Sequence, residues 1–301
     1  MNHKQSTPLD YIPRIRQYYQ ALGYAKPYVW AHFEDVPFCR LEKPLALAKI
    51  GIVTTAARIQ PGLGGQGPGA GYNAKAKFYQ VYADTTRQMP SLSIAHVAYD
   101  RLHSPADDPG AYFPLNALVE CVKDGVIGAV SDRFYGLPTN RSQKTTMNVD
   151  CIDLVAMCQE DGLDGVVLVP NCPVCHQSVS LAARALEENG IPGVVVGCAK
   201  DIVEHVGVPR FVFNNFPLGN SAGRPFDLRS QRTIAELALN LLRTATEPRT
   251  TVVSPFEWLG DPSWQQDYSN ADLLTREEIV RRKAEFDQAR LDARKIREAG
   301  E

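Results

Sequence analysis

Residues 164–196 constrain the fold more than any other stretch, because they read as a strand, a turn, a helix and a second strand. Residues 166–169 are apolar and β-branched, as expected for a strand buried on both faces. Cys172 then stands where a helix N-cap belongs, and Pro173 suits the first helical position. A glycine and a proline end the helix before residues 194–196 begin the next strand. This alternation predicts an α/β fold with parallel strands.

Similar patterns of strand and helix occur on both sides of this central unit. The sequence predicts further buried strands at 48–53, 94–97, 126–130 and 211–213, with helices at 115–123, 148–159 and 227–244. Parallel sheets in βαβ units follow from this alternation, arranged as two flavodoxin-like or Rossmann-like lobes with a cleft between them.

The chain divides by composition into four predicted segments. They are an N-terminal helix and aromatic arm (1–45), a first α/β lobe (46–143), a second α/β lobe carrying the sequence Cys-Pro-Val-Cys (144–255), and a turn-rich segment with a charged helix (256–301). A glycine-rich stretch at 61–71 lacks the register of a nucleotide-binding loop, and it is expected to be a loop or a lid over the site.

Composition excludes several classes of function. The formal net charge is −2, and no apolar run is long enough to span a membrane, so neither a nucleic-acid nor a membrane partner is expected. Seven cysteines with one close pair do not form a disulfide framework, and no apolar signal segment begins the chain. A cytoplasmic location is therefore expected.

The close pair, Cys172 and Cys175, gives the chain its most specific chemistry. A helix N-terminus stabilises a thiolate, which makes Cys172 a candidate nucleophile. The Cys-x-x-Cys spacing allows Cys175 to resolve an adduct or an oxidised sulfur as an intramolecular disulfide. Two alternatives remain open: a zinc site that also uses His176 and Cys198, and a pair of inert buried thiols.

Other polar residues follow predicted strands at the same edge of the sheet, where ligands bind in open α/β folds. Arg101 is a candidate anchor for a substrate carboxylate, and Asp100 a candidate group for orienting it or handling a proton. The full set of candidate site residues besides the cysteines is Thr54, Thr55, Asp100, Arg101, Arg133, Tyr135 and Asn214.

The ordered motifs resemble the selenoprotein B family of glycine/sarcosine/betaine reductase and D-proline reductase. The stretch around Cys-Pro-Val-Cys carries the resemblance, together with 46–56, 94–101, 113–136 and 209–242, so that it covers roughly residues 45 to 260. In that family the first position of the pair is often selenocysteine. The resemblance therefore implies a homologue with cysteine, Cys172, at this position.

The resemblance implies a thiol-dependent reductase that cleaves a carbon–heteroatom bond of a small molecule. Cys172 would attack, and Cys175 would resolve the adduct as a Cys172–Cys175 disulfide. No bound cofactor and no metal are expected, and an external dithiol or thioredoxin-like donor would restore the pair. Family members that act on glycine or proline work beside a pyruvoyl-bearing subunit. This chain itself is expected to form a homo-oligomer.

A cofactor-independent racemase of the aspartate/glutamate type is the main alternative. Such an enzyme needs two thiols on opposite sides of a cleft, one acting as acid and the other as base. Cys198 is the candidate partner of Cys172 for that chemistry.

Overall fold

The computed structural model describes residues 7–300, with side chains through residue 295, and has the expected α/β architecture. The strands are β1 (Lys49–Thr54), β2 (Ala57–Arg58), β3 (Tyr82–Thr85), β4 (Leu92–Ser93), β5 (Ala129–Val130), β6 (Arg133–Gly136), β7 (Gly165–Val169), β8 (Gly193–Gly197), β9 (Arg210–Phe213) and β10 (Thr250–Val253). The helices are α1 (Tyr11–Ala21), α2 (Leu115–Lys123), α3 (Gln143–Thr145), α4 (Cys151–Glu160), α5 (Pro173–Glu188), α6 (Lys200–Val206), α7 (Leu228–Thr244), α8 (Trp264–Asp267) and α9 (Arg276–Gly300).

A single mostly parallel sheet forms the centre of the fold, in the order β10-β9-β8-β7-β1-β6-β3. Only β3 runs antiparallel to its neighbour in this sheet, and β5 pairs with the beginning of β1. Among the parallel strands, those that come after β1 in the chain are first β5 and β6 on one side of it, and then β7 on the other. The parallel strands thus follow the flavodoxin-like order, whose switch point lies between β1 and β7.

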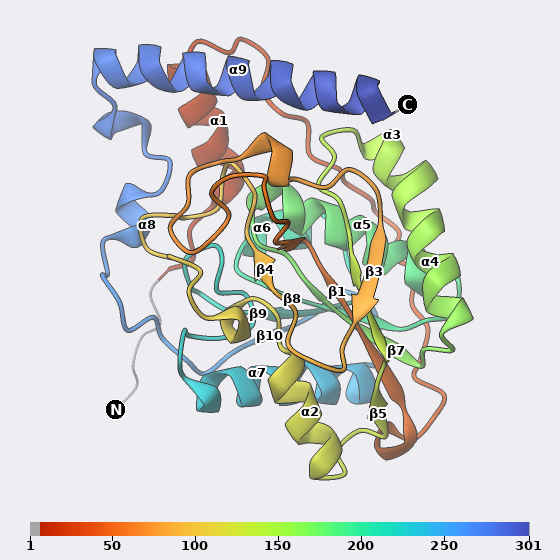
Figure 1. Ribbon diagram of the computed structural model, residues 1–301. Coiled ribbons are helices and arrows are strands. Elements are labelled where there is room, and N and C mark those ends of the chain that lie inside the picture. The colour runs from red at the N-terminus through yellow and green to blue at the C-terminus, as the bar shows by residue number, and fades with distance from the viewer. Residues whose placement is uncertain (1–6, 301) are drawn as a thin grey trace, which may run out of the picture.

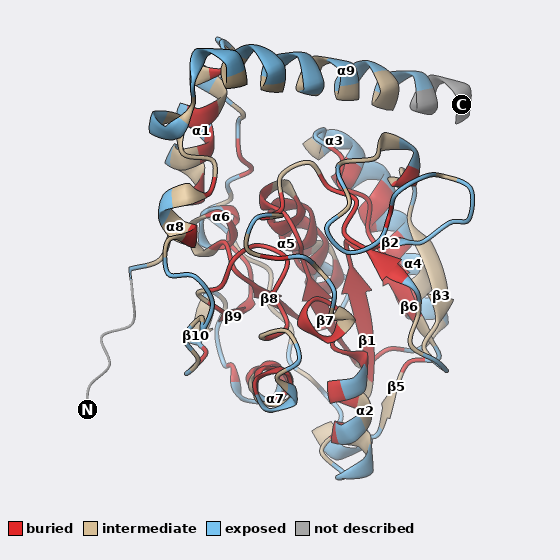
Figure 2. Ribbon diagram, turned by 60° about the vertical axis from the view of Figure 1, so that its left-hand side comes forward, coloured by how far each residue is buried: buried red, intermediate tan, exposed pale blue. Residues whose placement is uncertain are grey.

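Helices cover both faces of this sheet (Figure 1). On one face α4 packs against α5, and α5 against α6, while α2 and α7 pack together on the other. α9 runs along the outside, and most of its described residues are exposed or partly exposed (Figure 2).

Burial is concentrated in the central strands, as Figure 2 shows. Every residue of β7, β8 and β9 is buried, which explains why β7, β8 and residues 211–213 of β9 are continuous apolar runs rather than alternating patterns. Alternate residues of β7 belong to different hydrophobic clusters: Val167 and Val169 face the cluster that includes α7, whereas Val166 and Leu168 face the one that includes α4 and α5.

The structure differs from the expected two lobes in one respect. β1 belongs to the first predicted lobe and β7 to the second, yet they pair in parallel over five consecutive residues. The strands of both segments therefore form one continuous sheet, and the hydrogen-bonded seam between β1 and β7 takes the place of a cleft between separate sheets. The domain boundaries at residues 45, 143 and 255 stay a prediction.

Two of the predicted strands were misplaced. Residues 94–97 do not form a strand; the short β4 precedes them and pairs with β2 outside the main sheet. The strand predicted at 126–130 is confined to β5, and residues 133–136, expected as a turn beyond it, form a second strand, β6, because the chain resumes its pairing with β1 after a break at 131–132. Short apolar runs carry no information about their pairing partner, which explains both errors.

The backbone of the N-terminal arm is hydrogen-bonded to a buried ion pair of the core. Arg210 Nη1 donates to Glu187 Oε1 at 2.5 Å, and both side chains are fully buried. The arm supplies Cys39, whose N–H donates to Glu187 Oε2 at 2.6 Å and whose carbonyl accepts from Arg210 Nη2 at 2.6 Å. The guanidinium also lies over the Phe38 ring, 4.3 Å from its centroid. Arm, α5 and β9 thus share one network.

We expect Glu187→Gln to lower the free energy of unfolding by about 3–5 kcal/mol, because Arg210 would keep its buried charge without a counterion. Urea unfolding measures this change. The matched control is the neighbouring, exposed Glu188→Gln, which should change stability by less than about 0.5 kcal/mol. Equal stability of the two variants would contradict a role of the ion pair in the fold.

Candidate active site

Cys172 lies at the switch point of the sheet. β7 ends at Val169, and Cys172 follows as the N-cap of α5, beside the carboxyl end of β1. Its extended backbone, φ −139° and ψ 170°, lets its Sγ accept the N–H of Cys175 at 3.2 Å. A sulfur in this position lies at the unpaired N–H groups and the positive end of the helix dipole. This is the N-cap position that the sequence predicts for Cys172.

Cys172 and Cys175 are paired as a disulfide in the structure, with their Cα atoms 4.9 Å apart. The two residues differ in access: Cys172 keeps 4% of its surface exposed, whereas Cys175 is completely buried. Both residues are therefore buried, and Cys172 is the less enclosed of the two.

Thr139 and His96 lie beside the pair. Thr139 Oγ1 is 3.3 Å from Cys175 Sγ and 3.0 Å from His96 Nε2. A ring nitrogen of His96 and both sulfurs lie within 4.8 Å of one another. Burial, together with the charges of Lys77 and Arg101, lowers the pKa of His96 to about 3, so the ring is neutral near pH 7. Its Nδ1 is buried and has no partner among the described residues.

His176 joins the ends of two adjacent strands. Its Nδ1–H donates to the Cys172 carbonyl at 2.8 Å, and its Nε2 accepts the N–H groups of Cys198 at 2.9 Å and Ala199 at 3.2 Å. These partners fix one neutral tautomer, and burial lowers its pKa to about 4. A Cβ at Gly197 would lie 2.7 Å from Nε2, so the position needs glycine. With both ring nitrogens engaged, His176 is not arranged as a zinc ligand.

Thr54 and Thr55 form the wall of the site rather than a free binding edge. The Thr54 hydroxyl accepts the Ala56 N–H at 3.0 Å, and the Thr55 hydroxyl accepts both the backbone and side-chain N–H groups of Asn171, at 3.1 and 3.3 Å. All are buried. The carbonyl oxygen of the Asn171 side chain has no partner among the described residues.

Asn214 and Cys198 follow the neighbouring strands β9 and β8. Asn214 Nδ2 donates to the Ser221 carbonyl at 2.7 Å, while its Oδ1 is buried without a partner among the described residues. Cys198 Sγ is 3.8 Å from Ser221 Oγ, and burial raises its pKa to about 12. A thiol of this kind stays protonated at neutral pH, which does not favour it as the base of a racemase.

Arg101 extends toward the glycine-rich loop. Its Nε donates to the Ala70 carbonyl at 3.1 Å, its Nη1 to the Val97 carbonyl at 2.9 Å, and the guanidinium lies 4.2 Å from the Tyr99 ring centroid. Its Nη2 is buried and has no partner among the described residues. The charge of Arg101 is one of the causes that lower the pKa of His96.

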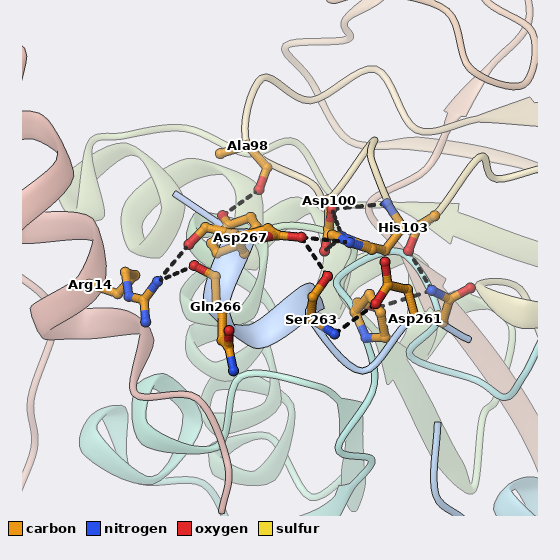
Figure 3. A network of polar contacts seen from close by, with 12 residues as sticks. Arg14, Ala98, Asp100, His103, Asp261, Ser263, Gln266 and Asp267 are labelled. Carbon is orange, nitrogen blue, oxygen red and sulfur yellow. Dashed lines mark hydrogen bonds and ion pairs between the residues drawn. The ribbon is translucent and has the colours of Figure 1, made fainter. Parts of the chain in front are cut away.

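Asp100 points to a different network from Arg101, shown in Figure 3. Its carboxylate accepts the backbone N–H of His103 and contacts His103 Nδ1, all at 3.1 Å, and His103 Nε2 lies 3.3 Å from Asp267 of α8. Burial raises the pKa of Asp100, which His103 opposes. Its described contacts are thus with His103 and not with the cysteine pair, so its predicted catalytic role finds no support in these contacts.

Arg133 and Tyr135 lie away from the cysteine pair. Arg133 forms ion pairs with Glu160 and Asp161, and the Tyr135 hydroxyl donates to Asp161. The Asp161 carbonyl also accepts Lys49 Nζ at 2.9 Å, at the amino end of β1. Both side chains therefore make their contacts at the edge of the sheet opposite Cys172. They do so because Arg133 and Tyr135 belong to strand β6 and not to a turn after a strand.

The sequence reasoning missed two residues, His96 and Thr139. His96 belongs to the same 94–101 motif as Asp100 and Arg101. The motif therefore pointed to this segment, but the prediction used its Asp-Arg pair and not its histidine. Thr139 follows β6 without any motif of its own. Only the pairing of β6 with β1 brings it to Cys175.

Comparisons with known proteins confirm the resemblance to this reductase family. The chain is 27% identical over 169 residues to D-proline reductase subunit gamma of Acetoanaerobium sticklandii, covering 56% of this chain and 69% of that subunit. It is 26% identical over 236 residues to glycine reductase complex component B subunit gamma of Peptoclostridium acidaminophilum, covering 75% of this chain and 52% of the relative.

Betaine reductase complex component B subunit beta of the same organism is 25% identical over 187 residues, which cover 59% of this chain and 41% of the relative. The chain thus spans about half the length of the glycine, betaine and sarcosine reductase subunits that it matches. No model of a protein family and no solved structure matches the chain. Within the described residues, no helix combines the length and the apolar character needed to cross a lipid bilayer.

The two buried histidines predict a loss of stability in acid. Their pKa values of about 4 and about 3 lie below the usual value of 6.5, so the unfolded chain binds their protons at higher pH than the folded chain. The free energy of unfolding therefore has its full value above pH 6.5. It falls toward pH 4 by about 1.4 kcal/mol per pH unit for each histidine. Urea unfolding from pH 7.5 to 4.5 measures this, and His176→Asn should reduce the slope. An identical slope in the variant would contradict the assignment.

Proposed function

We propose that this relative of the D-proline reductase and component B subunits is a thiol-dependent reductase that cleaves a carbon–heteroatom bond of a small molecule. The relatives are subunits of reductase complexes, which supports a reductase-type function. The observation that carries the finer proposal is the Cys172–Cys175 pair at the β1–β7 switch point, with Cys172 as the N-cap of α5.

The reaction begins from the reduced pair. The Cys172 thiolate attacks the carbon of a substrate R–X and displaces X⁻, which forms Cys172–S–R. Cys175 then attacks Cys172 Sγ, so that the disulfide forms and R leaves with the electron pair and takes up a proton as R–H. The substrate is reduced by two electrons and the two thiols are oxidised to one disulfide. An external dithiol or thioredoxin-like protein returns both thiols.

Arg101 supplies the recognition element that such a site needs. Its Nη2 is buried without a described partner, and a substrate carboxylate would accept that N–H. The buried oxygens of Asn171 and Asn214, also unpartnered among the described residues, would accept N–H or O–H groups of the same molecule. The substrate class is therefore a small carboxylate that also carries hydrogen-bond donors. The leaving group X is an amine or another heteroatom group, such as halide, nitrite or a thiol.

Partner proteins belong to this proposal as well. The relatives are subunits of multi-protein complexes, so this chain is expected to work with a further subunit, as well as with its electron donor. A homo-oligomer and a cytoplasmic location stay predictions. The reducing compartment is consistent with a pair that must return to the dithiol after each turnover.

Replacing the cysteines separates their roles. We expect Cys172→Ser to abolish turnover, and Cys175→Ser to stop after one turnover with the substrate carbon attached to Cys172. Mass spectrometry of the intact protein and its peptides, after incubation with candidate carboxylates, detects the adduct. Cys198→Ser is the matched control, since it changes a buried thiol at the neighbouring strand end.

The control also tests the alternatives. Full reductase activity in Cys198→Ser agrees with the proposal, whereas interconversion of substrate enantiomers that is lost in Cys198→Ser would establish the racemase instead. One equivalent of zinc in the purified protein, lost together with the fold on chelation, would establish a structural metal site.

Substitution of Arg101 tests the recognition step. We expect Arg101→Ala to lower kcat/KM by about a hundredfold, because loss of a charged anchor costs several kcal/mol of transition-state binding. Arg87→Ala is the control: its ion pair with Asp132 is exposed, and removing it should change kcat/KM by less than about threefold. Asp100→Asn should resemble the control in kcat/KM. Near-wild-type kinetics of Arg101→Ala would place substrate binding elsewhere.

A further inference from the structure

We propose that Thr139 and His96 form a proton relay that serves Cys175 when it resolves the adduct on Cys172. This inference rests on the proposed thiol chemistry and adds two residues to it, neither of which the comparisons or the sequence motifs assign. The relay takes the proton of Cys175 and delivers it to the carbon that Cys172 releases.

The contacts define a single path from the buried thiol. Cys175 Sγ is 3.3 Å from Thr139 Oγ1, which is 3.0 Å from His96 Nε2. Cys175 is completely buried, His96 is 4% exposed and Thr139 is 5% exposed, so solvent does not reach the thiol directly. In the reduced protein, the Thr139 hydroxyl can accept the S–H of Cys175 while it donates its own proton to His96.

Cys175 needs such assistance because it is completely buried, and burial disfavours a charged group relative to a neutral one. Burial raises the pKa of three other buried thiols, Cys151, Cys158 and Cys198, to about 12. A thiol of that kind does not attack a sulfur at neutral pH, because the thiolate is the nucleophile. The N–H of Cys175 is directed to Cys172 Sγ, so the N-cap contact assists Cys172 rather than Cys175.

The relay requires the neutral tautomer of His96 in which Nε2 accepts from Thr139, and the 3.0 Å contact between Nε2 and Thr139 Oγ1 is compatible with it. Burial and the nearby charges of Lys77 and Arg101 keep the ring neutral, with the two cysteines of α5 as its other titratable neighbours. A ring whose Nε2 accepts from Thr139 carries its hydrogen on Nδ1. That Nδ1 is buried and has no described partner, so its N–H is available to a molecule in the site.

The proton balance closes within the resolving step. Cys175 gives its proton to Thr139 as its sulfur bonds to Cys172 Sγ, and Thr139 gives its proton to His96 Nε2. In the same movement His96 gives its Nδ1 proton to the departing carbon, which forms R–H, so that the ring stays neutral throughout. When an external dithiol reduces the disulfide, the same path runs in reverse: Cys175 regains a proton from Nε2 through Thr139, and Nδ1 takes one from the dithiol.

Thiol–disulfide exchange tests the relay without any substrate. The reduced, full-length protein is mixed with excess oxidised glutathione, and closure of the Cys172–Cys175 disulfide is followed by alkylation and mass spectrometry from pH 6 to 10. We expect Thr139→Val and His96→Gln each to slow closure at pH 7 by about a hundredfold, the usual contribution of a positioned acid–base group. The defect should disappear toward pH 10, where hydroxide ionises the thiol directly. Thr139→Ser, which keeps the hydroxyl, should retain the wild-type profile.

Three outcomes would overturn the relay: wild-type closure rates in both variants, equal slowing at every pH, or failure of Thr139→Ser to rescue. Equal slowing at every pH is the mark of a purely structural role. If Thr139→Val does not fold, as judged by thermal unfolding, His96→Gln decides the question alone. Because the assay contains no substrate, an intact relay in a protein that reduces no carboxylate would contradict the proposed function and leave the relay standing.

Discussion

The parallel pairing of β1 with β7 is the constraint on which the rest of the structure depends. It places the carboxyl ends of two strands side by side at the point where the chain changes direction across the sheet. The Thr55 hydroxyl fixes that junction by accepting both N–H groups of Asn171. The residue after Asn171 is Cys172, so the position of the sulfur follows from the register of two buried strands. A site on such a framework does not depend on a loop to hold its nucleophile.

Two buried histidines lie next to this junction, and both are neutral for the same physical reason with different consequences. Both ring nitrogens of His176 are hydrogen-bonded to the backbone at Cys172 and Cys198, so this ring holds the two strand ends together. It cannot exchange a proton without breaking one of these hydrogen bonds. His96 has one nitrogen on Thr139 and the other without a described partner. Burial lowers the pKa of both rings, but only His96 has a nitrogen left for chemistry.

The sequence predicted the local unit around Cys172 closely, because its signals are local. A β-branched run, an N-cap, a proline and a terminating glycine each act within a few residues, and β7, α5 and β8 appear where these signals placed them. Contacts between distant segments were beyond the sequence. Arg133 and Tyr135 seemed to follow a strand but form β6 and contact Asp161. Asp100 and Arg101, adjacent in the chain, diverge to His103 and Ala70. Thr139 reaches Cys175 only through strand pairing, which no short motif records.

The two thiols of one helical turn therefore have separate environments, although the spacing alone would make them equivalent. The N-cap geometry directs the Cys175 N–H to Cys172 Sγ, which stabilises negative charge on Cys172 and leaves Cys175 without that benefit. Cys175 faces Thr139 instead, in a region that solvent does not reach. In the proposed reaction the nucleophile must be ionised before the substrate arrives, whereas the resolving thiol is better kept protonated until its attack, because early ionisation would repel the proposed carboxylate substrate. The N–H donated to Cys172 suits a nucleophile, and the Thr139 hydroxyl beside Cys175 suits a resolving thiol. In the proposed reaction, the order of the two cysteines along the chain would thus set the order of the two chemical steps.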